Sequence, residues 1–460
     1  MPLPAIAHSF GSLYTLPVPV WLYVYGATAA LALSFLIIGY FVTTPAQAKR
    51  NFSVSRWRPV HAPVLVTALQ LLSVGLLALT IISGLIGSNN SYLNFNMTFF
   101  WIIILLLYTY WVAVFGNSYN TLNPWQIVTN SIDRAIPNAF SGRRPYPPAL
   151  AYYPALLLYM ALIWIELFGK TKPLSLSLIL IAYSAINFLG AWWWGSKNWF
   201  HYGDLFSVFF RVMGKLAPLE WSHKGVRLRQ PFIGLLDQPC RDLSLLLFIL
   251  FMLSSTAYDG LHETELWRNL SREVSNLCIT ALDTTMRESP ILYSRIYRSF
   301  QGFALLISPF IYLAIYLALL FITKKLTRTD RPLYSLALEL GYSLVPIAFV
   351  YNLSHYFTLG LFQGPRIFRL ASDPFGYHWN LFGTQNWFVS PIMIAADTVW
   401  IIQVGLILIG HIISVYLMHL VALRVFNSGR MALISQIPLL ALMMLYTASG
   451  LWILSLPIQS

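Results

Sequence analysis

Hydrophobic and polar positions alternate along this chain on the scale of whole helices. Ten long apolar stretches are separated by shorter polar segments, and a helix needs about 20 mostly apolar residues to cross a bilayer. The stretches cover residues 20–42, 62–87, 97–116, 149–169, 173–196, 240–258, 301–323, 333–361, 391–421 and 431–456. We therefore predict an all-α fold, a polytopic transmembrane helical bundle of about 10 spans. It forms a single integral membrane domain over residues 1–460.

Composition agrees with this pattern. Hydrophobic residues make up 57% of the chain and charged residues only 10%, whereas about a quarter of a soluble domain is charged. The net charge is +13, but the sequence contains no run of five or more Lys or Arg residues. Such a run would be the signature of a nucleic-acid-binding patch. We expect the lipid bilayer as the partner and no nucleic acid. Residues 1–20 lack Lys and Arg, so we predict no cleavable signal peptide there.

The positive charges lie in alternate loops. The loops after spans one, three, five and seven contain Lys and Arg, whereas SNNSYLNFN after span two contains neither. Cytoplasmic loops carry the excess of Lys and Arg. We therefore predict a multi-pass protein of the cell inner (cytoplasmic) membrane with both termini outside the cytoplasm.

Three segments between the spans have patterns of their own. Residues 261–300 mix arginines with acidic residues, which predicts a small extracytoplasmic helical cap. On the cytoplasmic side, NPWQIVTNSIDRAIPNAF and GDLFSVFFRVMGKLAPLEW place aromatic residues on one face at helical spacing. Such amphipathic helices are expected to rest on the bilayer surface.

Ionisable residues inside apolar spans are costly, and each is a functional hypothesis. If spans eight and nine are antiparallel, His355 lies level with Asp397 near the outer surface. Asp259 ends span six on the same side, which predicts an outer polar layer. Glu339, His411 and His419 form an inner layer. The remaining ionisable groups, at span ends, are Glu166 and Asp242.

These groups supply candidate site residues. Asp259 and Asp397 are candidate catalytic carboxylates. The candidate metal ligands are His355, His411 and His419, for a divalent transition metal such as Zn or Cu. His411 and His419 are about 12 Å apart along one helix face at 1.5 Å per residue, too far to bind one ion together. The alternative to metal binding is that each histidine forms a hydrogen bond with a neighbouring helix. The alternative to catalysis for Asp259 is that it caps the following helix.

The segment after span eight, GPRIFRLASDPFG, is expected to turn on the outer surface, because Pro365 and Pro374 stop helices. Its candidate substrate-binding residues are Gln363, Arg366 and Asp373. The arginines could hold an anionic group over the outer layer, or they could pair with acidic residues of the cap.

Common catalytic motifs are missing from the sequence. It contains no GxxxxGK[ST], HExxH, CxxC or GxSxG pattern, which argues against a P-loop enzyme, a zincin and an α/β-hydrolase.

Several phrases together resemble a bacterial family of polytopic membrane proteins, the fenitrothion hydrolases. They are LPVPVWLYVYGATAALALSF, NTLNPWQIV, GDLFSVFFRVMGKLAPL, STAYDGLHETELW, LSHYFTLGLFQG, ASDPFGYHWNLFGT and GHIISVYLMHLVALRVF. The later phrases carry Asp259, His355, Gln363, Asp373, His411 and His419. The resemblance implies the membrane component of an organophosphate-hydrolysing complex.

Three functions are compatible with these observations. The first is a membrane subunit of a metal-dependent hydrolase-like complex, with an outward-facing polar site and partner subunits on the outer face. The second is a proton- or metal-coupled transporter, since two polar layers along spans eight and nine resemble an ion pathway and Pro309, Gly341 and Pro346 allow hinges. The third is a membrane anchor or assembly factor for a periplasmic complex.

Overall fold

The computed structural model describes residues 19–43, 54–59, 62–222, 224–281, 290–387, 394–426 and 428–455. Within these ranges, ten helical segments are long and apolar enough to cross a membrane. Each coincides with one of the predicted spans, so the prediction of an all-α polytopic bundle is confirmed.

The spans differ in how regular they are. Span three contains a π-helical stretch, and a 3₁₀ turn interrupts span eight. The spanning elements are α1 (Val20–Phe41), α3 (Pro63–Ile86), α4 (Phe95–Met97) with the π-helix Thr98–Leu107 and α5 (Tyr108–Phe115), α8 (Tyr153–Phe168), α9 (Pro173–Trp194), α12 (Leu243–His262), α14 (Pro290–Thr327), α15 (Leu333–Leu340) with the 3₁₀ turn Gly341–Leu344 and α16 (Val345–Gln363), α18 (Ala396–Val425) and α19 (Gly429–Ser455). The other elements are α6 (Tyr119–Leu122), α7 (Pro124–Ala135), the 3₁₀ turn Pro148–Leu150, α10 (Ser196–Tyr202), α11 (Leu205–Gly214), β1 (Leu219–Ser222), β2 (Gly225–Leu228), the 3₁₀ turn Ile233–Leu236, α13 (Glu265–Ala281) and α17 (Arg366–Ser372).

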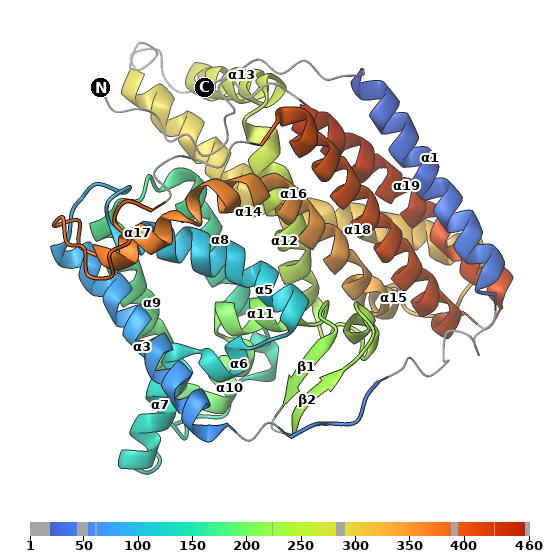
Figure 1. The fold of residues 1–460 in the computed structure, drawn as a ribbon. Helices are drawn as coiled ribbons and strands as arrows, with labels where there is room; N and C mark the ends of the chain where they lie inside the picture. Colours follow the sequence, from blue (N-terminus) through green and yellow to red (C-terminus); the bar gives the residue numbers. More distant parts are fainter. Residues whose placement is uncertain are drawn as a thin grey trace.

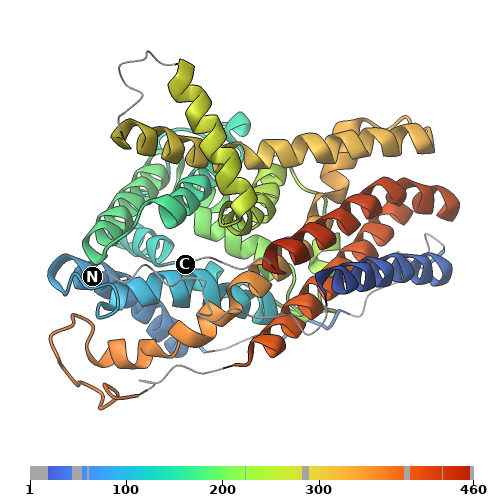
Figure 2. The same ribbon diagram turned by 90° about the horizontal axis from the view of Figure 1, so that it is seen from above.

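The first and the last two spans pack together on one side of the bundle. Helix α1 lies against α18 and α19, while α3 packs against α9 on the opposite side (Figures 1 and 2). Helices α12 and α16 pack against each other between these groups. We call the end of the bundle near α13 the α13 end, and the opposite end, which carries β1 and β2, the hairpin end (Figure 1).

Helix α12 is the core of the bundle. Every residue from Ser244 to Thr256 is buried, as expected for a helix that is apolar on all faces. Because lipid chains are as apolar as leucine, close packing rather than transfer from water stabilises such a helix. The polar residue Asp259 lies at the α13 end of this helix and is therefore enclosed by the bundle, with an exposed fraction of 2%.

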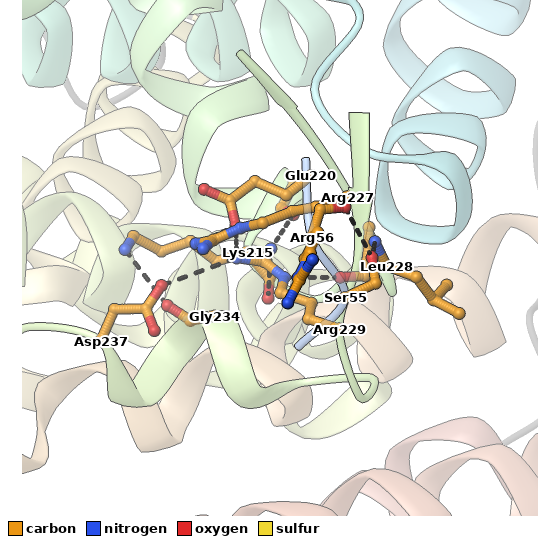
Figure 3. Close-up of polar contacts among 11 residues, drawn as sticks. Ser55, Arg56, Lys215, Glu220, Arg227, Leu228, Arg229, Gly234 and Asp237 are labelled. Carbon is orange, nitrogen blue, oxygen red and sulfur yellow. Dashed lines mark hydrogen bonds and ion pairs between the residues drawn. The ribbon is translucent and has the colours of Figure 1, made fainter. Parts of the chain in front are cut away.

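The loops after spans one and five meet at the hairpin end. Strands β1 and β2 form an antiparallel hairpin, and residues 54–59 run beside β2. Arg58 N donates to Val226 O at 2.8 Å. Ser55 N donates to Leu228 O at 2.8 Å (Figure 3). Two of the loops predicted to share the cytoplasmic side therefore lie on the same side of the bundle.

Helix α11 differs from the prediction that it rests on the bilayer surface. Its residues Leu205, Phe206, Val208, Phe210 and Val212 are all buried, and the helix packs against α5 and α8 inside the bundle. With ten residues, it is too short to span a membrane. It is a short helix enclosed by the spans, and the aromatic face taken for a lipid-facing surface contacts other helices.

Burying a short helix requires partners for the backbone groups at both of its ends. At its N-terminus, Asp204 Oδ2 accepts hydrogen bonds from Ser207 N at 3.2 Å, Ser207 Oγ at 2.6 Å and Asn123 Nδ2 at 2.9 Å. The other carboxyl oxygen accepts from Tyr183 Oη. Asn123 itself caps α7 through Trp125 N and Gln126 N. One carboxyl group therefore joins α7, α9 and α11.

We expect Asp204→Ala to destabilise the protein by about 3 kcal/mol, because it removes a helix cap and leaves several buried donors unpaired. Burial raises the pKa of Asp204, and the hydrogen bonds from Ser207, Tyr183 and Asn123 oppose that shift. A neutral Asp204→Asn side chain keeps the cap, so this matched variant should lose at most about 1 kcal/mol. Unfolding in detergent measures both, and equal losses would contradict this role for the carboxyl group.

The segment predicted as a cap is helical in its described part, but it is continuous with a span. Helix α14 begins at Pro290, so residues 290–300 are the first turns of span seven. Helix α13 packs against α14, where Trp267 Nε1 donates to Gln301 Oε1 at 2.8 Å and the Trp267 ring stacks on Phe300. The described part of this segment is therefore one helix, α13, that packs against the first turns of α14.

Candidate functional site

A buried carboxylate and imidazole meet at the α13 end of α12 and α16. His355 Nε2 lies 2.9 Å from Asp259 Oδ2, and their side chains are 8% and 3% exposed. Tyr356 Oη donates to the same oxygen at 2.5 Å. An ionised carboxylate only accepts hydrogen bonds, so with Asp259 charged the proton of this contact lies on His355 Nε2. Asp259, His355 and Tyr356 together are called the Asp259 site.

A second pair of ionisable groups connects this site with the surface of the α13 end. His262 Nδ1 lies 2.6 Å from the carbonyl oxygen of Asp259 and 3.7 Å from its Oδ1. His262 Nε2 lies 3.2 Å from Glu263 Oε1. The Glu263 side chain is 39% exposed and that of His262 only 16%. Glu263, His262, Asp259 and His355 thus form a series of titratable groups that leads from solvent into the core.

A small cavity lies beside Asp259. Its volume is about 70 Å³, and its polar lining includes Asp259, Tyr356, Asn352 and Glu166, an exposed residue of α8. Such a volume holds a few water molecules. The π-helical stretch of span three contributes Trp101 and other apolar side chains to the wall. The sequence predicted Glu166 at the end of a span, and the structure places it on the same cavity as Asp259.

The predicted pairing of His355 with Asp397 is not observed. Helices α16 and α18 do pack closely, but Gln403 Nε2 donates to Ser354 O at 3.0 Å. This register leaves Asp397 about 9 Å further along α18, at 1.5 Å per residue. Asp397 is exposed in the first turn of α18, where its Oδ1 accepts from Thr398 N at 2.7 Å. The carboxylate that meets His355 is Asp259.

The two inner histidines lie in separate surroundings. His411 is 2% exposed, and its Nδ1 contacts Ile407 O at 2.8 Å. His419 is fully buried; its Nε2 contacts Val42 O at 2.7 Å, and its Nδ1 lies 2.9 Å from Gln436 Nε2. His419 thus connects the ends of α1, α18 and α19 and has both ring nitrogens occupied. This is the helix-to-helix hydrogen bonding that was the alternative to metal binding.

The predicted substrate-binding residues lie in or near the loop after span eight. Asp373 Oδ1 accepts from Tyr377 N at 2.9 Å, and Oδ2 accepts from His378 N at 2.7 Å, so its carboxylate holds its own turn. Arg366 is exposed, with its guanidinium 5.3 Å from the centre of the Tyr92 ring. Gln363 is half-buried at the end of α16. These contacts dock the loop on the start of span three.

A joint metal centre is not formed by the predicted ligands. Across the ranges that the structure describes, no group of three or more His, Cys, Asp or Glu side chains is placed to hold a metal ion. His355, His411 and His419 each have a different set of neighbours, as described above. A zinc site uses three or four protein ligands, so the structure gives no support to metal binding at these residues, which stays a prediction.

Three residues of the observed series of polar groups were not predicted from the sequence. Tyr356 directly follows His355, and His262 and Glu263 directly follow the α12 core. The rarity of ionisable residues in apolar spans identified Asp259 and His355. Tyrosine is common at membrane borders, and residues 262 and 263 were assigned to the external segment. Only the packing of α12 against α16 brings these groups together.

No protein-family model, curated protein or solved structure matches this chain. The resemblance to fenitrothion hydrolases therefore stays a prediction.

Proposed function

We propose that this chain is a proton-coupled membrane transporter and that the Asp259 site is its proton-binding site. The observation that supports this most directly is the series Glu263, His262, Asp259 and His355, which runs from an exposed carboxylate to a buried one. Chains of Asp, Glu and His side chains inside spans are typical of proton relays in transporters. The nearby cavity gives the proton a water-sized space to enter.

Irregular backbone in two of the spans supports a transporter that changes conformation. Span eight is interrupted by the 3₁₀ turn Gly341–Leu344, close to the predicted break at Gly341. Span three contains the π-helix Thr98–Leu107, which forms a wall of the Asp259 cavity. Broken helices and π-bulges are frequent at hinges and functional sites. Protonation of Asp259 would change the charge between α12 and α16, the two helices that carry the site.

We place the chain in the cytoplasmic membrane of the cell, with both termini and the α13 end outside. The support is the alternation of basic loops and the meeting of two such loops at the hairpin end. The Asp259 site then faces the external solution through Glu263. Protons would enter from the side that is acidic in a respiring cell.

A pH jump applied to purified protein in liposomes tests the proposal. Fast acidification of the external solution should produce a transient inward current, because protons enter a buried site. Asp397→Asn should leave this current unchanged, since Asp397 is exposed and outside the relay. Protein-free liposomes provide the baseline. A current no larger than that baseline would refute proton binding within the membrane.

The second candidate is the membrane subunit of a hydrolase-like complex. The Asp259–His355 pair favours it, because a carboxylate that orients an imidazole is a general-base arrangement able to activate water. Partner subunits on the outer face would supply the substrate pocket and any Zn or Cu. Release of nitrophenol from a p-nitrophenyl phosphotriester, measured with metal content on protein purified in mild detergent, separates this candidate from a transporter.

A further inference from the structure

A second and larger cavity lies on the other side of α12 and α16. Its volume is about 370 Å³, within the range of small-molecule pockets. Side chains of α12, α14, α16, α18 and α19 line it, and most of them are apolar. The Asp259 site belongs to the smaller cavity.

Two buried polar atoms of the lining lack a hydrogen-bond partner in the described part of the chain. They are His411 Nε2 and Tyr351 Oη, on residues that are 2% and 6% exposed. His411 Nδ1 donates to Ile407 O, a bond that puts the ring proton on Nδ1. Nε2 is therefore a lone-pair acceptor. Leaving such a buried group unpaired is unfavourable, and native proteins keep few of them.

Several other polar groups around this cavity are already paired. Ser254 Oγ and Ser308 Oγ are 2.8 Å apart, and Tyr258 Oη donates to Gln301 Oε1 at 2.6 Å. Ser449 Oγ donates to Tyr446 O within its own helix. Largely apolar cavities hold little ordered water and accept apolar molecules. A water molecule could pair with His411 Nε2, but most of the lining offers water no hydrogen-bond partner.

The route into the cavity is apolar as well. Of its lining residues, Ile311 on α14 is 51% exposed and Trp452 on α19 is 39% exposed. Both lie on spans, where an exposed side chain meets the hydrocarbon of the bilayer. A molecule that enters past Ile311 and Trp452 therefore comes from the membrane rather than from water.

We propose that this cavity binds a neutral, apolar molecule with one hydroxyl group, an alcohol or a phenol taken up from the bilayer. Its hydroxyl group donates to His411 Nε2 and accepts from Tyr351 Oη. Its apolar part occupies the space between α12, α14 and α19. This inference is independent of the proposed function, since it uses none of the residues of the Asp259 site.

Photolabelling of the full chain tests this site directly. A diazirine alkanol, 3-azioctanol, is added to the purified protein in lipid nanodiscs, and the labelled residues are identified by mass spectrometry. We expect labels on cavity residues such as Tyr351 and Tyr446, and protection by excess 1-octanol. The matched alkane, n-octane, should protect about five- to a hundredfold less well, the value of the two hydrogen bonds.

Variants separate hydrogen bonding from simple partition into the membrane. His411→Phe keeps a ring and removes the acceptor, so protection by 1-octanol should fall about three- to tenfold, towards that of n-octane. Tyr351→Phe serves as a second variant should the first fail to fold, and Tyr40→Phe, outside the cavity, is the control with an unchanged preference. Labels confined to exposed span residues such as Leu36 and Tyr40, or equal protection by both competitors in the wild type, would refute the proposal.

Discussion

Replacing Arg229 by leucine is expected to destabilise the protein by about 3 kcal/mol or more, because it removes a buried, multiply bonded charge. Arg229 is 7% exposed. Its guanidinium donates to Ala217 O at 3.0 Å, Gly214 O at 2.9 Å and Lys215 O at 3.2 Å. These carbonyl groups belong to the last turn of α11 and the residues after it. Arg229 is thus the C-terminal counterpart of Asp204.

Acidic groups compensate the charge of Arg229. Its Nη1 lies 3.4 Å from Glu220 Oε2 and 3.6 Å from Asp237 Oδ2 (Figure 3). Burial lowers the pKa of Arg229, while Glu220 and Asp237 raise it. Arg229→Leu would leave the carbonyl groups at the end of α11 without donors in an enclosed region. A helix end without partners is not tolerated there.

Arg227 is a matched control two residues earlier on β2. Arg227 also pairs with Glu220, at 2.7 Å, but its side chain is 29% exposed compared with 6% for Arg229. Exposed ion pairs contribute at most about 1 kcal/mol, so Arg227→Leu should have a small effect. Folded yield from size-exclusion chromatography and unfolding by SDS titration measure both variants. Similar losses for the two arginines would show that α11 does not depend on Arg229.

The spans could be predicted from sequence because their signal is local. Length and apolarity decide whether a segment can cross a bilayer, and all ten predicted spans correspond to observed helices. Helix α11 was predicted wrongly for a physical reason. An amphipathic helix on a bilayer and a short helix inside a bundle share the same aromatic periodicity. They differ in the groups at their ends, and Asp204 and Arg229 gain their partners only in the folded chain.

The candidate site was partly predictable. Asp259 and His355 are conspicuous as ionisable residues in apolar stretches, and the structure brings them into contact. Which of these residues contact each other depends on the register of the packed helices, and hydropathy does not predict that register. The antiparallel order of spans eight and nine suggested Asp397 as the partner of His355, but the register set by Gln403 and Ser354 moves Asp397 beyond the site. His411 and His419 share a helix face, yet they contact different neighbours.

Replacing Asp259 by asparagine should reduce the charge moved in a pH jump at least about tenfold, because it removes the group that binds the proton. The protein should still fold. Two of its hydrogen bonds go to one oxygen, Oδ2, from His355 Nε2 and Tyr356 Oη. The amide oxygen of asparagine can accept both, while its amino group takes the place of Oδ1.

If Glu263, His262, Asp259 and His355 act as a proton relay, variants along the series should affect the current to different degrees. Glu263→Gln removes an exposed member, so it should slow the current without reducing the total charge moved, since protons still reach His262 from solvent. Tyr356→Phe removes one donor to Asp259 but keeps the carboxyl group, so it should reduce the charge moved less than Asp259→Asn does. A current that survives in Asp259→Asn at full amplitude would place the proton-binding group elsewhere, and the Asp259–His355 contact would then be a structural link between α12 and α16.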